Sequence, residues 1–238
     1  MAYFEYDKQM STTFDHYKKN NNLPSVIYKY GHFNIKQKPA NYDNIKVLNM
    51  DTLDAYQLLL NNGYKNPVLL NLANGIKPCW GQILGYSQEE VLFRRTNLHK
   101  ALNSKYYPLR DTLIYTPKVE VYLNSDFKLL DKIFNVNIIT CDAVDCPMLK
   151  NGKFSKTIYN MTYEKIENIL LTAIVNKHDS IILGAFGCGV FNNPPEQIAN
   201  IFLEVINKYG GHFKIIYFAV LSINDDENYN IFKNILEK

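Results

Sequence analysis

From Val47 onward, short apolar runs alternate with longer amphipathic stretches, and this alternation constrains the fold more than any other feature of the sequence. The run 68–72 is apolar on both faces, as in a central parallel strand that is covered on both sides. Further strands are expected at 112–115, 119–123, 136–140, 180–185 and 213–220, and helices at 51–62, 162–175, 194–209 and 225–236, with one more starting after Ser87. The pattern predicts an α/β sandwich with a mostly parallel or mixed sheet.

Residues 1–45 differ from the rest of the chain, because they are polar and aromatic and show no clear period. We expect them to hold one or two short helices that pack on the outside of the main domain. Residues 46–238 show no internal repeat and no linker, so they are expected to form one domain. The predicted organisation is therefore an N-terminal helical extension, 1–45, and a core domain, 46–238.

Composition narrows the classes of function. The chain is 47% hydrophobic with a net charge of +3, which gives no case for direct binding of nucleic acid or membranes. No stretch approaches the roughly 20 apolar residues of a membrane span, and the start of the chain lacks a signal-peptide pattern. The four cysteines form neither a CxxC pair nor a cluster with histidines. We expect a cytoplasmic monomer, with access to a nucleus left open, that uses no metal ion and no cofactor.

The segment 184–191 joins a predicted buried strand to a helix that starts near Pro194. Gly184, Gly187 and Gly189 permit positive φ angles and let backbone amides approach a ligand closely. Amides presented near a helix N-terminus form a nest that suits a phosphate or diphosphate. The alternative is a tight turn that merely needs flexible residues, since the spacing matches neither the P-loop nor the dinucleotide-binding pattern.

The loop after the 68–72 strand carries a second group of polar residues. Asn74 lies where that strand ends, and its amide offers a donor and an acceptor that suit ribose hydroxyls. Glu89 and Glu90 open the next helix, and Ser87 with Glu90 has the spacing of a capping box. Because neighbouring helical side chains diverge by about 100°, only one of the two carboxylates can face a ligand. The alternative is a pair of carboxylates that only complement the helix dipole.

These motifs, taken in order, resemble the microbial-type poly(ADP-ribose) glycohydrolases, a branch of the macrodomain fold. The resemblance rests on Asn-x-Ala-Asn at 71–74, a proline-led turn at 78–81, Gln-Glu-Glu at 88–90 and Gly-Ala-Phe-Gly-Cys-Gly-Val-Phe at 184–191, with further similarity at 47–53, 114–119 and 138–140. It covers most of the chain from Val47 onward. It implies a three-layer α/β/α macrodomain-like sandwich with a central mixed sheet.

The resemblance also implies roles for individual residues. Glu90 corresponds to the catalytic carboxylate, which would act as general acid in hydrolysis of the O-glycosidic ribose–ribose bonds of poly(ADP-ribose), releasing ADP-ribose. Glu89 would contact ribose hydroxyls, and Asn74 would orient the same distal ribose. The remaining implied ligand contacts are Gly81, Gln88, Gly184, Ala185, Gly187, Cys188, Gly189, Val190 and Phe191. The implied partners are ADP-ribose and poly(ADP-ribose) or ADP-ribosylated proteins.

One departure from the family pattern bears on activity. Where the family has three consecutive glycines, this chain has Cys79-Trp80-Gly81. The Trp80 ring would contact the ligand, occlude the site or anchor the loop. The alternative function is therefore a non-catalytic or weakly catalytic macrodomain that binds ADP-ribose or its derivatives. The intact Gln-Glu-Glu motif at 88–90 favours the enzyme.

Other polar residues near these loops have less specific interpretations. Asp142 and Asp145 follow the 136–140 strand, where a loop-capping role is favoured over a substrate contact. Cys188 has no histidine near it in sequence, so it is interpreted as a small packing residue. Arg94 and Arg95 are expected to be surface charges.

Overall fold

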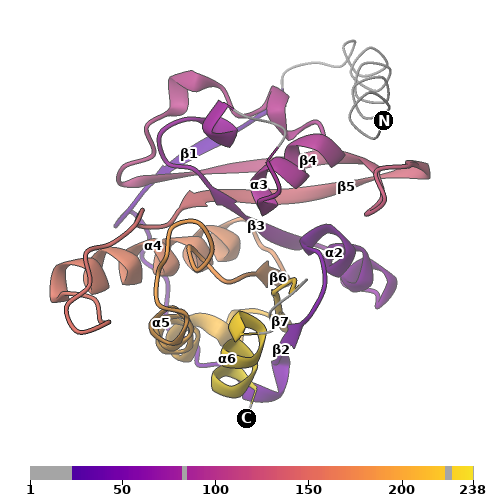
Figure 1. Cartoon of the computed structure of the whole chain (residues 1–238). Coiled ribbons are helices and arrows are strands. Elements are labelled where there is room, and N and C mark those ends of the chain that lie inside the picture. Colours follow the sequence, from indigo (N-terminus) through magenta and orange to yellow (C-terminus); the bar gives the residue numbers. More distant parts are fainter. Residues whose placement is uncertain (1–22, 82–84, 223–226, 238) are drawn as a thin grey trace.

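Within residues 23–81, 85–222 and 227–237, which the computed structural model describes, the chain is organised by a seven-stranded mixed sheet (Figure 1). The strands are β1 (Val26–Lys29), β2 (Ile45–Leu48), β3 (Pro67–Ala73), β4 (Thr112–Leu123), β5 (Leu129–Asp142), β6 (Ser180–Leu183) and β7 (Ile215–Ala219), in the spatial order β1-β4-β5-β3-β6-β7-β2. β4 pairs antiparallel with β1 and with β5, and the other neighbouring strands are parallel.

Helices cover both faces of this sheet. They are α2 (Thr52–Asn61), α3 (Gln88–Arg95), α4 (Lys156–Val175), α5 (Pro195–Tyr209) and α6 (Glu227–Leu236). One core lies beneath α4, α5 and α6, and a separate core lies beneath α2 and α3. Figure 1 shows α4, α5 and α6 together on one side of the sheet and α2 on the other. The predicted three-layer α/β/α sandwich is confirmed. In the described ranges, no helix is long and apolar enough to span a membrane.

The predicted elements of the core domain are confirmed, with shifted ends. The strands expected at 112–115 and 119–123 form one strand, β4, whose pairing with β5 shifts register between Thr116 and Val119. Pro117 has no amide hydrogen to donate, and Lys118 has a positive φ of 57°. This bulge breaks the alternation of side chains, so the sequence pattern divides one strand into two.

The segment before Ile45 differs from its expected helical form. Residues 23–45 contribute β1, which pairs with β4 at the edge of the sheet, and a three-residue 3-10 turn at Tyr42–Asn44. β1 is four residues long and mostly exposed, so it has too little apolar alternation to be detected from sequence. The helices predicted within 1–22 lie outside the described residues, and the boundary at residue 45 stays a prediction.

The sheet brings the two chemically distinctive loops to one edge. β3 lies between β5 and β6, and all three run parallel. The loop after β3 carries Asn74, the loop after β6 carries the glycine-rich segment 184–191, and the loop after β5 lies beside both. In such sheets ligands bind beyond the carboxyl ends of the strands. This edge is therefore the place for a site.

Candidate active site

A cleft of about 860 Å³ lies at this edge of the sheet, within the size range of small-molecule sites. The loop after β3 and the start of α3 line it with Asn74, Gly85, Tyr86, Ser87, Gln88, Glu89 and Glu90. The loop after β6 lines it with Ala185, Phe186, Gly187, Gly189, Val190 and Phe191. The structure therefore brings both predicted loops, which are far apart in sequence, to one cavity.

Glu89 is buried beneath the loop after β3, with 2% of its surface exposed. Its Oε2 atom accepts hydrogen bonds from the backbone amides of Asn74 at 3.0 Å and Cys79 at 3.1 Å, and its Oε1 atom accepts one from Asn71 Nδ2 at 3.2 Å. Burial raises the pKa of Glu89 to about 7; the bonds from Asn74 and Asn71 oppose the rise, and the charge of Glu90 adds to it. Glu89 thus holds the first part of the loop, from Asn74 to Cys79, at both of its ends, and its implied contact with ribose hydroxyls stays a prediction.

Cys79 occupies the first position of the altered turn. Its φ of 51° is left-handed, a conformation that glycine adopts without strain. Cys79 therefore has a backbone conformation that suits glycine, although its side chain is not glycine. Pro78–Gly81 forms a 3-10 turn, but the Trp80 side chain lies outside the described residues. The possible contact of Trp80 with a ligand, and that of Gly81, stay predictions.

A potential metal-ligand set also lies here. Among the described residues, Cys79, Glu89 and Glu90 offer ligand atoms within 4.8 Å of one another. Metal binding requires the thiolate, yet burial, reinforced by the Glu89 and Glu90 charges, raises the pKa of the Cys79 thiol. The Glu89 oxygens also accept three hydrogen bonds from the protein. The set therefore fits a hydrogen-bonded cluster better than a metal centre.

Glu90 lies on the cleft side of α3 and is half-buried. The Ser87 hydroxyl donates a hydrogen bond to Glu90 Oε2 and makes no bond to a helix amide, so the predicted capping box is wrong. A Cβ atom on Gly85 would lie 2.9 Å from the Glu90 carboxyl carbon. Gly85 therefore leaves the space that the Glu90 carboxyl group occupies. The sequence gives one sign of this role, namely a glycine two positions before the helix cap Ser87.

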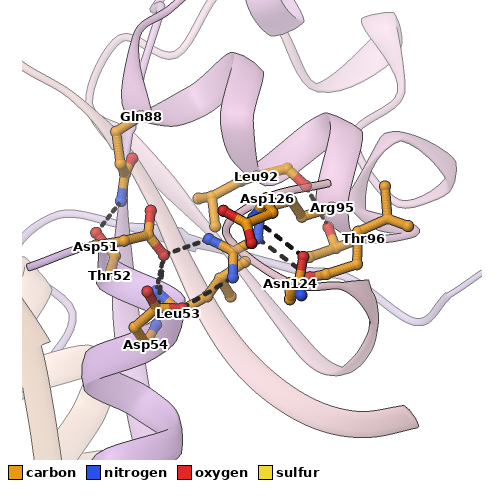
Figure 2. A network of polar contacts seen from close by, with 11 residues as sticks. Asp51, Thr52, Leu53, Asp54, Gln88, Leu92, Arg95, Thr96, Asn124 and Asp126 are labelled. Carbon is orange, nitrogen blue, oxygen red and sulfur yellow. Dashed lines mark hydrogen bonds and ion pairs between the residues drawn. The ribbon is translucent and has the colours of Figure 1, made fainter. Parts of the chain in front are cut away.

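Gln88 connects α3 to the strand beside it. Its Nε2 atom donates to the Leu70 carbonyl at 2.7 Å and to Thr52 Oγ1 at 3.2 Å, and its Oε1 atom accepts from the Leu72 amide at 2.8 Å (Figure 2 shows the Thr52 contact). Both ends of its side-chain amide are thus bonded within the protein. Its implied ligand contact stays a prediction, and its observed contacts position α3 against β3.

Arg94 and Arg95 are buried, so their interpretation as surface charges is wrong. Arg95 is 3% exposed and pairs with Asp51 at 2.6 Å and with Asp54 at 3.0 Å (Figure 2). Arg94 donates a hydrogen bond to the Gly85 carbonyl. The short α3 packs its last turn into the protein, which the sequence pattern of eight residues does not reveal. These contacts tie α3 to the N-terminus of α2 and to the loop before Ser87.

Asn193 shapes the glycine-rich loop from beneath. It is 2% exposed, and its Nδ2 atom donates to the carbonyls of Val144 at 2.8 Å, Gly187 at 3.0 Å and Phe191 at 3.3 Å. Gly187 has a φ of 72°, and a Cβ atom there would lie 2.5 Å from Ala143 Cβ and from Asn193 Nδ2. The close approach and the positive φ both require glycine at this position.

The amides of this loop are left available by that arrangement. Within the described ranges, the backbone N–H groups of Gly187, Gly189, Val190 and Phe191 donate to no protein acceptor. A side chain on Gly189 would meet nothing within 4 Å, so the cleft is open at this point. Unpaired amides directly before α5 form the kind of nest that binds an anion.

The other residues predicted in this loop divide into two groups. Ala185, Phe186 and Phe191 line the cleft, and the Phe186 side chain is also buried in the core beneath it. Burial raises the pKa of Cys188 to about 12, which fits the predicted packing role and not a nucleophile. Gly184 packs against the end of β7, where a Cβ atom would lie 3.3 Å from a backbone oxygen.

Asp142 forms an ion pair with Lys165 on α4, and not the predicted loop cap. The two charged groups are 2.7 Å apart and largely buried. Burial raises the pKa of Asp142 while Lys165 lowers it; burial lowers the pKa of Lys165, but the Cys141 and Asp142 groups raise it overall. A Cβ atom on Gly75 would overlap the Asp142 carboxylate. Asp142 therefore supports the turn that carries Asn74.

Comparison with known proteins identifies the family. The model of the microbial-type PARG catalytic domain matches residues 3–124, just over half of the 238-residue chain. The chain belongs to the microbial-type PARG family. The match includes the Gln-Glu-Glu motif at 88–90 and ends before the glycine-rich loop. Membership makes this chain a glycosidase of the poly(ADP-ribose) glycohydrolase type.

Two solved structures of poly(ADP-ribose) glycohydrolases are similar to this chain in fold. Poly(ADP-ribose) glycohydrolase from Deinococcus radiodurans in complex with ADP-ribose is 26% identical, with a TM-score of 0.73, over 82% of this chain and 84% of that one. The Thermomonospora curvata enzyme is 22% identical, with a TM-score of 0.77, over 96% of this chain and 88% of that one, and shares the fold.

A curated relative matches part of the chain. It is an uncharacterised protein of Sulfurisphaera tokodaii, 36% identical over 75 residues, which are 32% of this chain. The matched part spans 41% of that relative's own length.

Proposed function

We propose that this chain hydrolyses the O-glycosidic ribose–ribose bonds of poly(ADP-ribose) and releases ADP-ribose, with Glu90 as general acid. The observation that carries the proposal is the single cleft lined both by Glu90 and by the free amides of the loop after β6. Family membership supports it, as does the 26% identical Deinococcus radiodurans enzyme, which was solved with ADP-ribose.

The proposed binding mode follows from the positions of the free backbone amides and of the residues that line the cleft. The diphosphate lies against the backbone amides of Gly187, Gly189, Val190 and Phe191, since these are donors without a protein acceptor in the described residues and they lie together in one glycine-rich loop. The distal ribose then lies between Asn74 and Phe191, near Glu90. The adenosine extends toward the other end of the cleft, which Leu221 lines.

The proposed chemistry is acid-assisted cleavage of the ribosyl C–O bond. The bond breaks through a transition state that resembles an oxocarbenium ion, so the leaving oxygen needs a proton. Glu90 donates that proton, and the nearby diphosphate stabilises the developing positive charge. Water then adds to the anomeric carbon and returns a proton to Glu90. Glu89, buried behind Glu90, fixes the loop that positions the ribose.

The test is incubation with automodified protein that carries poly(ADP-ribose), using wild type, Glu90→Gln and Glu90→Ala. We expect both variants to release ADP-ribose about 10²–10⁴-fold more slowly, as for loss of a general acid. Their affinity for ADP-ribose, measured by calorimetry, should change little. Glu196→Gln is the matched control, because Glu196 is an exposed carboxylate in the first turn of α5, away from the cleft.

Two results would contradict this assignment. If wild type binds ADP-ribose tightly but releases none from the polymer, the chain is a non-catalytic macrodomain. If Glu90→Gln keeps the wild-type rate, another group supplies the proton.

A further inference from the structure

Two side chains from opposite ends of α3 reach the start of α2 (Figure 2). At the start of α3, Gln88 Nε2 donates a hydrogen bond to Thr52 Oγ1 at 3.2 Å. At the end of α3, the Arg95 guanidinium pairs with Asp51 at 2.6 Å and with Asp54 at 3.0 Å. These three partners are the N-cap residue of α2 and two residues of its first turn. The two helices are therefore joined at two points by polar side chains.

The Arg95 guanidinium is enclosed at this junction. Arg95 is 3% exposed, and its Nε atom donates to the Leu123 carbonyl at 3.1 Å, so each of its three side-chain nitrogens has an acceptor. Asp51 Oδ1, which accepts from Arg95, also accepts from the α2 amides of Leu53 at 2.8 Å and Asp54 at 3.3 Å. Removing one partner of a buried ion pair leaves the other charge without compensation. The pair therefore fixes the end of α3 relative to the start of α2.

α3 is too short to keep its orientation by itself. It has eight residues, and isolated helices below about 12–15 residues are marginal in water. Its orientation therefore depends on its contacts with the rest of the protein. Glu90 lies in the first turn of α3, five positions before Arg95, which is about 7.5 Å along the helix axis. The anchoring of Arg95 therefore affects where the Glu90 carboxyl group lies.

The start of α2 belongs to the far end of the cleft. Residues 50–52 line the cleft, as does Leu221. β2 and β7 are parallel neighbours, so the chain before α2 and the chain after β7 leave the sheet at the same edge. In the binding mode above, the adenosine extends to this end, and this step rests on the proposed function. Asp51 thus belongs both to the wall beside the adenosine and to the ion pair with Arg95.

We propose that Arg95 is a positioning residue that couples the two ends of the cleft. Adenosine held against the start of α2 fixes α3 through Arg95, and α3 then orients Glu90 toward the bond to be broken. Arg95 is not among the described residues that line the cleft, so it acts through Asp51 and α3. Binding energy from a part of the substrate that does not react is thereby used to orient the reacting group.

The first test uses AMP as the probe, because AMP fills the adenosine end of the cleft and lacks the distal ribose. Hydrogen exchange followed by mass spectrometry reports on residues 92–95, the last turn of α3, which lie outside the cleft lining. In wild type we expect saturating AMP to slow exchange there at least about fivefold. In Arg95→Met, AMP should bind, as calorimetry will show, without slowing this exchange.

The second test measures kcat and KM with poly(ADP-ribose). Arg95→Met keeps an unbranched side chain but loses the charge and all three donors. We expect its kcat to fall about 10–100-fold, because the general acid is less well oriented. Its affinity for ADP-ribose should stay within about threefold of wild type, since the contacts of the ligand remain. Arg95→Lys keeps a cation that can reach Asp51 but lacks the planar fork, so its kcat should lie between the two.

Two further variants separate positioning from stability. Asp54→Asn removes one charged partner of Arg95, and Asp54 lies outside the cleft lining, so we expect a smaller fall in kcat at nearly wild-type stability. Val205→Ala creates a small cavity in the core beneath α5, on the other face of the sheet. It should lose stability while its kcat stays that of wild type. All rates are measured at a temperature at which circular dichroism shows each variant to be folded.

The outcomes separate this inference from the proposed function. Equal slowing of exchange by AMP in wild type and Arg95→Met, or no slowing in wild type, overturns the coupling. A wild-type kcat in Arg95→Met, or an equal fall in Val205→Ala, overturns the positioning role. If wild type hydrolyses no polymer, the proposed function fails. Slowing of exchange by AMP in wild type alone would then still support the coupling through Arg95.

Discussion

The two loops that form the cleft are held in opposite ways. In the loop after β3, the buried carboxylate of Glu89 accepts hydrogen bonds from backbone amides, so the donors of this loop are used inside the protein. In the loop after β6, the buried amide of Asn193 donates to backbone carbonyls, so the acceptors are used and the amides of Gly187 and Val190 stay free. A buried side-chain acceptor fixes a loop by binding the backbone amides of that loop. A buried side-chain donor binds the backbone carbonyls instead, so the amides remain available to an anion.

This difference matches the two tasks of the site. A general acid needs a substrate held in a fixed orientation, and a loop fixed at both ends provides that orientation. A diphosphate binds best to amides that already point outward, because the cost of reorienting them on binding would lower the affinity. Replacing the buried donor of Asn193 by an acceptor, or removing the buried acceptor of Glu89, should therefore destabilise the loop that each side chain supports.

The largest effect is expected from Asn193→Asp. The substitution replaces an NH₂ group that serves three carbonyls with an oxygen that faces them. We expect a loss of at least about 4 kcal/mol in the free energy of unfolding at neutral pH, measured by urea denaturation. The loss should shrink in acid, where the carboxyl group is protonated. A loss that does not depend on pH would show that the direction of these bonds is unimportant.

Glu89→Ala tests the opposite arrangement and is expected to cost about 3 kcal/mol, because it leaves the Asn74 and Cys79 amides without their acceptor. Glu89→Gln keeps an oxygen for those amides. If the Asn71 side-chain amide turns over, so that its Oδ1 atom faces residue 89, the new NH₂ group can also donate to that oxygen, which has no hydrogen-bond partner among the described residues of the wild type. We therefore expect Glu89→Gln to lose less than about 1 kcal/mol in urea denaturation. Equal losses in the two variants would rule out the proposed support of the loop.

Much of the fold and the position of the two loops were predictable from sequence, because the patterns that indicate them are local. Apolar runs such as 68–72 predict buried strands, and the glycines of 184–191 predict free amides. Asn193 was not predicted, because the Val144 carbonyl that it reaches lies 49 positions away. The burial of Arg95 was missed for the same reason, since its partner Asp51 is the N-cap residue of α2, 44 positions earlier in the chain. The structural roles of these polar residues depend on contacts with segments distant in sequence, which local patterns do not reveal.

The pH dependence of stability provides a third test of the Glu89 site. In the folded protein its pKa is raised to about 7 from an ordinary 4.5, so the folded state keeps a proton that the unfolded state releases. The resulting stabilisation is fully present below pH 4.5 and is lost as the pH rises through about 7. It amounts to about 3 kcal/mol at most.

The measurement is urea denaturation of wild type and Glu89→Gln between pH 4 and pH 8. The difference in unfolding free energy between them isolates this residue from the histidines and from Asp142. We expect wild type to lose stability relative to Glu89→Gln as the pH rises. A constant difference across this range would mean that folding does not shift the pKa of Glu89.

The smallest expected effect distinguishes two glycines within one loop. Gly187→Ala places a Cβ atom 2.5 Å from Ala143 and from Asn193, at a φ of 72°, and should cost about 2 kcal/mol in unfolding free energy. Gly189→Ala is the matched control, because its Cβ atom meets nothing within 4 Å, and should change stability by less than about 0.5 kcal/mol.

Calorimetry with ADP-ribose then relates these glycines to ligand binding. We expect Gly187→Ala to bind about tenfold more weakly, because Asn193 must move and the amides that it positions move with it. Gly189→Ala keeps its backbone amide, so its affinity should fall by less. An equal loss of affinity in both variants, with a loss of stability only in Gly187→Ala, would contradict this expectation. It would mean that the open space beside Gly189 contributes to ligand binding as much as the position of the amides does.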